Sequence, residues 1–443
     1  MRTTGAANAR LPAGAANARL PAVALFAATA VLLGLTAGFG LGVWLLFART
    51  EGVSVFGASW LALVQVHGRI QLFGFAGLFV MGVGLHVLPR FRAAAAPARG
   101  LVAACYGLTL AGLAGRAIAQ PSPDLPLRGA VLALAGVLLV AGTAVFAATA
   151  LDRLRSGSNP HRTDEIVIAL GITAMPLAAL LAASETIGQA PLVVDAAVDD
   201  RVVWAMLLGC LATTIFGVWA RLAPGFVATP PARSAPLLAG VALWEAGVLA
   251  LVAGAPLGAA LLLAGVVITT TALGVYGTTI AHQPLAGHAR LTRLAVRSAF
   301  AWAAAGSALL ALDAAGVGPA SSFLAVSAAR HALGLGFVTL MLYGVAARAL
   351  PSFVGRRLWS LRLQGACLLL ANAGVALRVI PQALGQAGAA ADGLVAASGL
   401  IAYAALVAFA LNVVRTLRSS PVPEGVVVRG AVPIAMADER RSR

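Results

Sequence analysis

The sequence contains no lysine, and charged residues of all kinds make up only 10% of its 443 positions. A soluble domain of this length carries about 25% charged residues on average. Hydrophobic residues reach 60%, which is more apolar surface than one protein core could bury. The composition therefore excludes a soluble domain and predicts that lipid covers much of the molecule.

Cysteine is also scarce. Cys105, Cys210 and Cys367 are the only three, and each falls inside an apolar segment. They form no Cys-x-x-Cys pair and no disulfide framework. We interpret them as buried, inert thiols, with a soft metal ligand as the alternative.

Acidic residues are too few to balance the arginines, so the formal net charge is +16. A nucleic-acid-binding protein would gather that charge on one face or in one domain. Here the arginines lie in short loops between apolar runs, as the positive-inside rule of membrane proteins requires. We therefore exclude nucleic acid as a partner and expect the lipid bilayer instead.

Apolar runs long enough to cross a bilayer recur along the whole chain. We predict an all-α, polytopic membrane protein with about twelve transmembrane helices. The runs fall at about residues 20–48, 59–88, 99–119, 127–150, 165–186, 201–223, 235–253, 256–281, 292–312, 322–350, 363–381 and 391–416. We expect them to form a single membrane domain over residues 20–418.

The two ends of the chain differ from this domain. Residues 5–13 and 14–22 are identical copies of Gly-Ala-Ala-Asn-Ala-Arg-Leu-Pro-Ala, which is typical of a basic, disordered tail. The apolar run that follows is too long for a secretory signal and continues as the first span. We predict disordered tails over residues 1–19 and 419–443.

The arginines mark one face of the bilayer. They lie before the first span, after the last span and in every second loop between, at Arg2, Arg10, Arg19, Arg90, Arg92, Arg99, Arg153, Arg155, Arg162, Arg233, Arg290, Arg293, Arg356, Arg357, Arg362, Arg415 and Arg418. The opposite face carries few arginines and several aspartates, at Asp124, Asp195, Asp199, Asp200 and Asp313. Because arginine-rich loops stay in the cytoplasm, we predict that both termini are cytoplasmic.

Three spans end in the same pattern, in which Gly-Val begins seven residues before a proline and a phenylalanine follows two residues after it. The prolines are Pro89, Pro224 and Pro351, spaced by 135 and 127 residues. Each interval holds four spans, and an even number keeps the repeats in one orientation. We therefore predict three parallel four-helix repeats about an axis normal to the membrane, whereas a transporter of the major facilitator type would have two halves of six.

Two histidines occupy matching depths within the spans. His67 lies 22 residues before Pro89, and His331 lies 20 residues before Pro351, so on parallel helices they differ in depth by about 3 Å. Two imidazoles at one depth can bind both faces of a haem iron, and such a six-coordinate iron suits electron transfer. Small residues follow both histidines and leave room for a flat macrocycle.

Three further residues near these spans are candidates for the site. Arg69 and Arg330 flank the two histidines on the outer side, where basic residues are sparse. They are candidate partners of haem propionates, with simple interface charges as the alternative. His86 lies about 28 Å beyond His67 along the helix and occupies the place of an arginine in the other two repeats. That equivalence favours a polar interfacial role for His86 over a second site that binds haem iron.

Two motifs around these histidines resemble those of a known family. The stretch His67-Gly-Arg-Ile-Gln-Leu-Phe-Gly-Phe-Ala-Gly-Leu-Phe-Val-Met-Gly resembles the second span of the NnrS family of haem- and copper-containing membrane proteins. Arg330-His331-Ala-Leu-Gly-Leu-Gly-Phe-Val-Thr is similar to another signature of that family. The resemblance implies a haem protein of the bacterial inner membrane with a part in the response to nitric oxide, or in respiratory metal and haem handling.

The first motif departs from the hallmark of that family, which is His-x-His-Glu-Met-Leu-Phe-Gly. Arg69 replaces the second histidine, and Ile70 and Gln71 replace the glutamate and the methionine. These departures remove candidate ligands and weigh against a copper site without excluding one.

A wider resemblance is to subunit I of the haem-copper oxidases, which also arranges its spans in three arcs. Its low-spin haem is held by histidines of spans 2 and 10, and His67 and His331 match those positions. Its copper site has no match, because span 6 offers Trp204 and Cys210 but no histidine, and span 7 has no histidine pair. The resemblance implies an oxidase core that keeps the electron-entry haem and lacks the reaction centre.

We therefore expect a bis-His, b-type haem used for electron transfer or sensing in nitric oxide or respiratory metabolism, with a redox partner that the sequence does not name. Two alternatives stay open. One is a cofactor-free transporter in which His67 and His331 line a pathway, and the other is a divergent haem-copper oxidoreductase.

Overall fold

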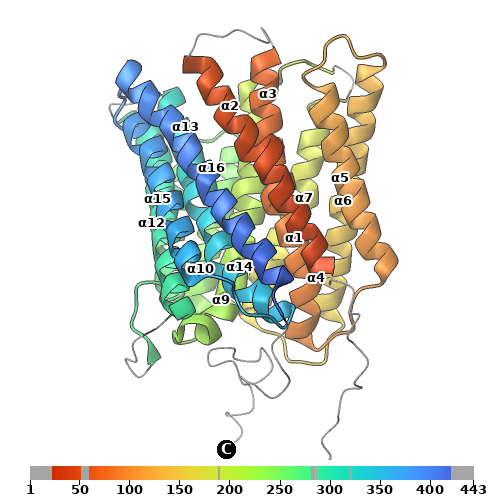
Figure 1. The fold of residues 1–443 in the computed structure, drawn as a ribbon, viewed down its shortest axis with the longest axis vertical. Helices are drawn as coiled ribbons and strands as arrows, with labels where there is room; N and C mark the ends of the chain where they lie inside the picture. Colours follow the sequence, from red (N-terminus) through yellow and green to blue (C-terminus); the bar gives the residue numbers. More distant parts are fainter. Residues whose placement is uncertain are drawn as a thin grey trace, which may run out of the picture.

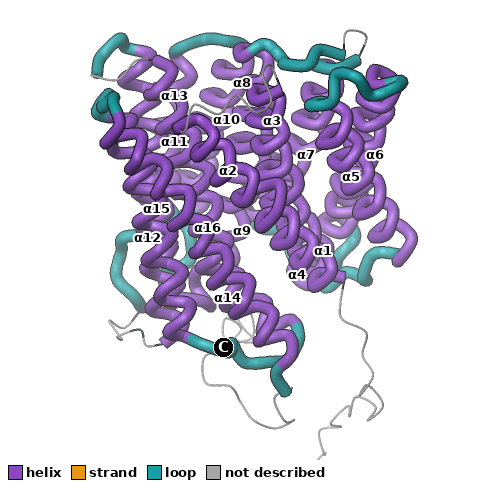
Figure 2. Tube along the Cα trace, turned by 45° about the horizontal axis from the view of Figure 1, so that its top comes forward, coloured by secondary structure: helices purple, strands orange, loops and turns teal. Residues whose placement is uncertain are grey.

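The computed structural model describes residues 22–50, 59–187, 190–280, 285, 287–318 and 322–420. Within those ranges every regular element is a helix, and the helices run side by side in one bundle (Figure 1). A second view, with the top of the bundle turned forward, shows the same arrangement, with loops confined to its two ends (Figure 2). The predicted all-α class is confirmed. The predicted tails lie outside the described residues, apart from residues 419 and 420.

The helices follow one another up and down the bundle in chain order, and η marks a π-helical stretch within a span. The first four spans are α1–η1–α2 (Ala22–Leu33, Gly34–Gly38, Phe39–Thr50), α3–η2–α4 (Ser59–Arg69, Ile70–Gly77, Leu78–Arg92), α5 (Arg99–Ala119) and α6 (Arg128–Arg155). The next four are α7 (Thr163–Ser184), α8–η3–α9 (Ala196–Trp204, Ala205–Ala212, Thr213–Val227), α10 (Ser234–Val252) and α11 (Leu257–Ala272). The last four are α12 (Gly287–Ala314), α13–η5–α14 (Ser322–His331, Ala332–Thr339, Leu340–Phe353), α15 (Leu361–Ala383) and α16 (Ala389–Arg418).

Among the described residues, eleven of these segments are long and apolar enough to cross a membrane, and the shorter α11 is the exception. The sequence predicts a span over 256–281, but α11 ends at Ala272. Gly274 follows with a φ of +62°, and a glycine in this left-handed conformation commonly ends a helix. The bundle begins with α1 and ends with α16 at the same end (Figure 1), as an even number of crossings requires.

Three spans form the centre of the bundle. In the most apolar stretches of the spans that contain η2, η3 and η5, 78%, 89% and 72% of the residues are buried, against at most 50% in the other candidate spans. Large apolar side chains stay exposed on the outer helices, for example Leu134, Leu249 and Leu369. A soluble monomer rarely leaves such wide apolar areas exposed, so these outer helices present the surface that lipid would cover.

The same three central spans carry the repeat. Each has an eight-residue π-helical stretch, at Ile70–Gly77, Ala205–Ala212 and Ala332–Thr339. These stretches begin 135 and 127 residues apart, which is the spacing of the three prolines. Because π-helical stretches are rare, their recurrence at one spacing supports a true structural repeat.

A ring of three contacts, each between an arginine or histidine and a phenylalanine, closes the proline end of these spans. The guanidinium of Arg221 lies 5.1 Å from the ring of Phe91, and that of Arg348 lies 5.1 Å from the ring of Phe226. The third contact joins the rings of His86 and Phe353, 4.6 Å apart. In each contact, the arginine or histidine of one repeat packs on the phenylalanine of the repeat before it. The first repeat packs on the third in the same way, which closes the ring. Such a closed relation requires an axis along the bundle, so the predicted threefold arrangement of parallel repeats is confirmed.

Candidate functional site: a histidine pair beside a buried ion-pair network

His67 lies near the end of α3, and the first span fixes its ring. Its Nδ1 is 2.9 Å from the carbonyl oxygen of Gly38, the last residue of the π-helical stretch η1. A carbonyl oxygen only accepts hydrogen bonds, so the proton lies on Nδ1. The lone pair is therefore on Nε2, where a metal ion would bind.

His331 is the last residue of α13 and repeats this arrangement. Its Nδ1 is 2.7 Å from the carbonyl oxygen of Ser327, one turn earlier on the same helix. Nδ1 again carries the proton, which leaves the lone pair on Nε2. Histidines that bind metals usually donate their other ring N–H to a carbonyl or a carboxylate, and both of these histidines do so.

His67 and His331 share a charged neighbour. Each ring lies within electrostatic range of the other and of Arg378 on α15. Two nearby glycines leave room: a methyl group added at Gly68 would meet no atom within 4 Å, and one at Gly334 would meet only Leu207, at 3.9 Å. Two imidazoles with the lone pair on Nε2 and small residues close by are compatible with a flat group that has a metal at its centre.

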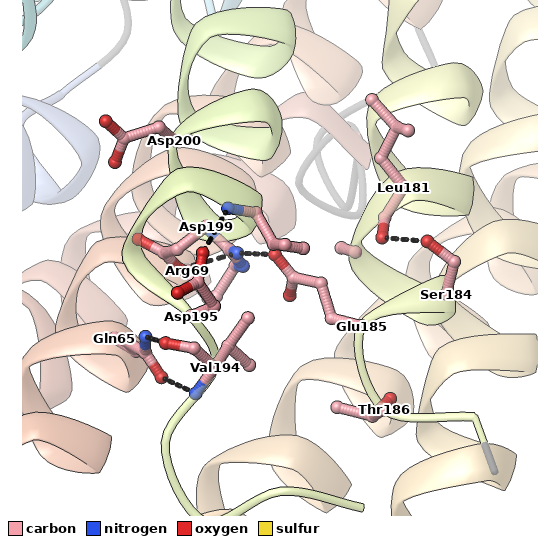
Figure 3. Close-up of polar contacts among 12 residues, drawn as sticks. Gln65, Arg69, Leu181, Ser184, Glu185, Thr186, Val194, Asp195, Asp199 and Asp200 are labelled. Carbon is pink, nitrogen blue, oxygen red and sulfur yellow. Dashed lines mark hydrogen bonds and ion pairs between the residues drawn. The ribbon is translucent and has the colours of Figure 1, made fainter. Parts of the chain in front are cut away.

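A buried ion-pair network surrounds Arg69, which lies two residues after His67 in the sequence (Figure 3). Glu185, which follows α7, accepts from Arg69 Nη2 at 2.6 Å through one oxygen and from Arg116 Nη2 at 2.7 Å through the other. Arg69 Nη2 also donates to Asp199 of α8 at 2.8 Å. The Glu185 side chain is 0% exposed. An unpaired charge in such a place is strongly unfavourable, and here two arginines and two carboxylates balance each other.

A second ion pair extends this network to the tenth span. Asp200, the residue after Asp199, pairs with Arg330. Arg330 immediately precedes His331, and Arg69 lies two residues after His67. Adjacent carboxylates on α8 therefore hold arginines that neighbour both histidines.

The role predicted for Arg69 and Arg330, contact with haem propionates, stays a prediction. The ion pairs of both residues use only Nη2, and a guanidinium has five N–H donors. Donors therefore remain for a further anionic group on both side chains.

Sequence reasoning missed several members of this site. Arg116, Arg378 and Glu185 lie within or at the edge of apolar runs. A charged residue in such a position is a candidate for a functional site, so the sequence could have indicated these three. Asp199 and Asp200 were interpreted only as charges of an outer loop. Their partners could not be identified because the paired residues are 69 to 130 positions apart in the sequence.

His86 does not join the site. It lies on α4 toward the other end of the span, where its ring packs on Phe353 and its carbonyl accepts from Arg90. This placement agrees with the interfacial role that the repeat suggests. Elsewhere, His161 Nδ1 lies 3.2 Å from a carboxylate oxygen of Glu165, and His282 lies outside the described residues.

The region between spans six, seven, nine and ten is filled by aromatic rings. Phe216 lies 5.2 Å from Trp244 and 5.9 Å from Phe300, and Phe300 lies 5.2 Å from Phe337. These rings pack in edge-on and tilted geometries that give close-packed cores. Over the residues that the structure describes, no group of three or more His, Cys, Asp or Glu side chains could hold a metal ion.

The family model described as NnrS protein matches residues 21–420 of this chain. The chain belongs to the NnrS family. The match spans nearly the whole membrane domain of this NnrS-family protein and confirms the resemblance seen in the two histidine motifs. A comparison with curated protein sequences gives no significant match.

Among solved structures, this NnrS-family protein is similar to a haem-copper terminal oxidase dimer studied by cryo-electron microscopy. The two chains are 14% identical, with a TM-score of 0.61, and the similarity covers 91% of this chain and 86% of the other. At this identity the similarity establishes the fold alone. The predicted oxidase-like arrangement of spans is thereby confirmed.

Proposed function

We propose that this NnrS-family protein binds one b-type haem between His67 and His331 and uses it for electron transfer or sensing. The observation that carries the proposal is the shared tautomer: both rings donate Nδ1–H to backbone carbonyls at 2.9 and 2.7 Å, which leaves Nε2 as the ligand atom. The sequence has no Cys-x-x-Cys-His motif, so we expect no covalent attachment of the haem.

Each residue of the site has a defined part in this proposal. A haem with two imidazole ligands supplies one-electron chemistry. Gly38 and Ser327 orient the two rings through their carbonyls, and Gly68 and Gly334 leave the space that the macrocycle needs. Arg69 and Arg330 are the proposed propionate partners, and Arg378 is a third candidate because its charge reaches both histidines.

The cellular role is also a proposal. Membership of the NnrS family supports a place in the bacterial inner membrane and a part in the response to nitric oxide or in respiratory metabolism. A redox partner would approach from the end of the bundle where the two histidines lie. Copper would need ligands beyond the histidine pair.

The spectrum of the purified protein tests the haem directly. We expect the reduced-minus-oxidised spectrum of a six-coordinate low-spin haem b, and we expect His67→Ala and His331→Ala each to remove it, because either loss destroys six-coordination. His86→Ala is the matched control and should retain the spectrum. A full low-spin spectrum in His331→Ala would refute the assignment and favour a cofactor-free transporter.

A further inference from the structure

The buried ion-pair network includes arginines that lie close in sequence to both proposed haem ligands. A contribution to folding alone does not explain this position. Buried ion pairs are weak stabilisers, and well-packed apolar residues often replace them without loss of stability. Here three arginines and three carboxylates lie together at one end of the bundle. Two of those arginines neighbour the two proposed haem ligands in the sequence. The position of the network therefore points to a role in the site.

We propose that Glu185, Asp199 and Asp200 are positioning residues that set the geometry and the redox potential of the haem between His67 and His331. The inference rests on the proposed function, because it requires a haem at that pair. It goes further in assigning the control of that haem to carboxylates of the fifth and sixth spans, which supply no iron ligand.

The first step of the argument is mechanical. The ligand helices α3 and α13 belong to different repeats, and α8 links them through two adjacent side chains. Asp199 holds Arg69 at 2.8 Å, and Asp200 holds Arg330, whose guanidinium also packs 5.4 Å from the centre of the Trp204 ring. Because Trp204 belongs to α8 as well, Arg330 is held there at two points. The depth of each histidine is thus tied to one helix, α8.

The second step is electrostatic. The central group of Arg69, Arg116, Glu185 and Asp199 carries two positive and two negative charges, and Arg330 with Asp200 adds one of each. Oxidised haem carries one more positive charge than reduced haem, so an added positive charge nearby favours the reduced form. Burial makes such an effect strong, because the protein interior screens charge less than water does.

A redox titration with paired variants tests the electrostatic step. We expect Glu185→Gln and Asp199→Asn to shift the midpoint potential to more positive values, since each leaves one excess positive charge. Arg116→Gln should shift it to more negative values. The double variant Glu185→Gln/Arg116→Gln restores neutrality and should return the potential toward that of the wild type. A residue that only supports the fold would not give shifts of opposite sign.

Electron paramagnetic resonance of the oxidised haem tests the mechanical step. Its low-spin g values depend on the orientation of the two imidazole planes, so Asp200→Asn should alter them by removing one of the two contacts that hold Arg330. Asp195→Asn is the matched control: Asp195 caps the same helix α8, but it is exposed and solvent screens its charge. We expect this control to leave both the potential and the g values nearly unchanged.

The outcomes separate this inference from the proposed function. If the wild type shows a low-spin haem but the charge variants leave its potential unchanged or shift it in one common direction, the inference is wrong and the proposed function stands. Should Glu185→Gln fail to fold, Arg116→Gln and the double variant still decide the matter. A wild type without any low-spin haem overturns both.

Discussion

At the scale of single residues, the first span controls the ring of His67 through two contacts. The carbonyl of Gly38 accepts the Nδ1 proton, and the backbone of Gly42 lies so close that an added methyl group would be 2.6 Å from His67 Cε1. The absence of a side chain at Gly42 therefore allows the ring to take its place. The sequence offered no sign of this contact, because Gly42 is one of 49 glycines.

Gly42→Ala provides a test of this packing. The added methyl group must displace the imidazole, and overpacking of this kind costs about 1–3 kcal/mol, so we expect the affinity for haem to fall on the order of tenfold. The Soret absorbance per protein after titration with haem measures it. Gly107→Ala on α5 is the control, since its methyl group would meet no atom within 4 Å. Equal loss in both variants would mean that Gly42 has no special relation to His67.

At the scale of elements, what the sequence could predict follows from what it encodes locally. Span positions follow from hydropathy, and the repeat follows from the prolines Pro89, Pro224 and Pro351, which are visible at one spacing. The π-helical stretches could not be predicted, because they have no residue signature of their own. The early end of α11 depends on the conformation of Gly274. Because glycine is also common inside membrane helices, its presence in the sequence does not identify the end of a helix.

Some members of the candidate site could be predicted from the sequence, and others could not. The two histidines were identifiable because an ionisable residue inside the membrane is energetically costly and therefore indicates a function. The repeat also predicts that both lie at a similar depth. The partner of Arg69 was not identifiable, because Glu185 and Asp199 lie 116 and 130 residues away. Only the packed bundle selects among the acidic residues that the chain offers.

The ring of three contacts between the central spans yields a prediction for His86. The other two repeats have arginine at this place, and an arginine over an aromatic face gains about 0.5–1 kcal/mol at exposed sites. We therefore expect His86→Arg to raise the melting temperature in detergent while the haem spectrum is unchanged. Adding Phe353→Leu to this variant should cancel the gain. Loss of the low-spin spectrum in His86→Arg would instead indicate a haem site at His86.

At the scale of the whole molecule, the two ends of the bundle differ in how their arginines are used. At the histidine end, Arg69, Arg116 and Arg330 are all paired with buried or half-buried carboxylates, so they add little net charge. At the other end, where α1 begins and α16 ends (Figure 1), some arginines also pair with carboxylates, but the arginines outnumber the acidic residues. The asymmetry of free positive charge is therefore larger than a count of arginines suggests.

This asymmetry predicts the orientation in the membrane. Free arginines retain short loops in the cytoplasm, so the end with both chain termini should be cytoplasmic and the histidine pair should lie near the periplasmic side. A fluorescent protein fused after residue 418 should fluoresce, because it folds in the cytoplasm, whereas alkaline phosphatase fused there should be inactive. Alkaline phosphatase inserted between α5 and α6, in the loop that contains Asp124, should be active. Activity at residue 418 together with none at the α5–α6 loop would invert the orientation and place the haem on the cytoplasmic side, within reach of soluble reductants.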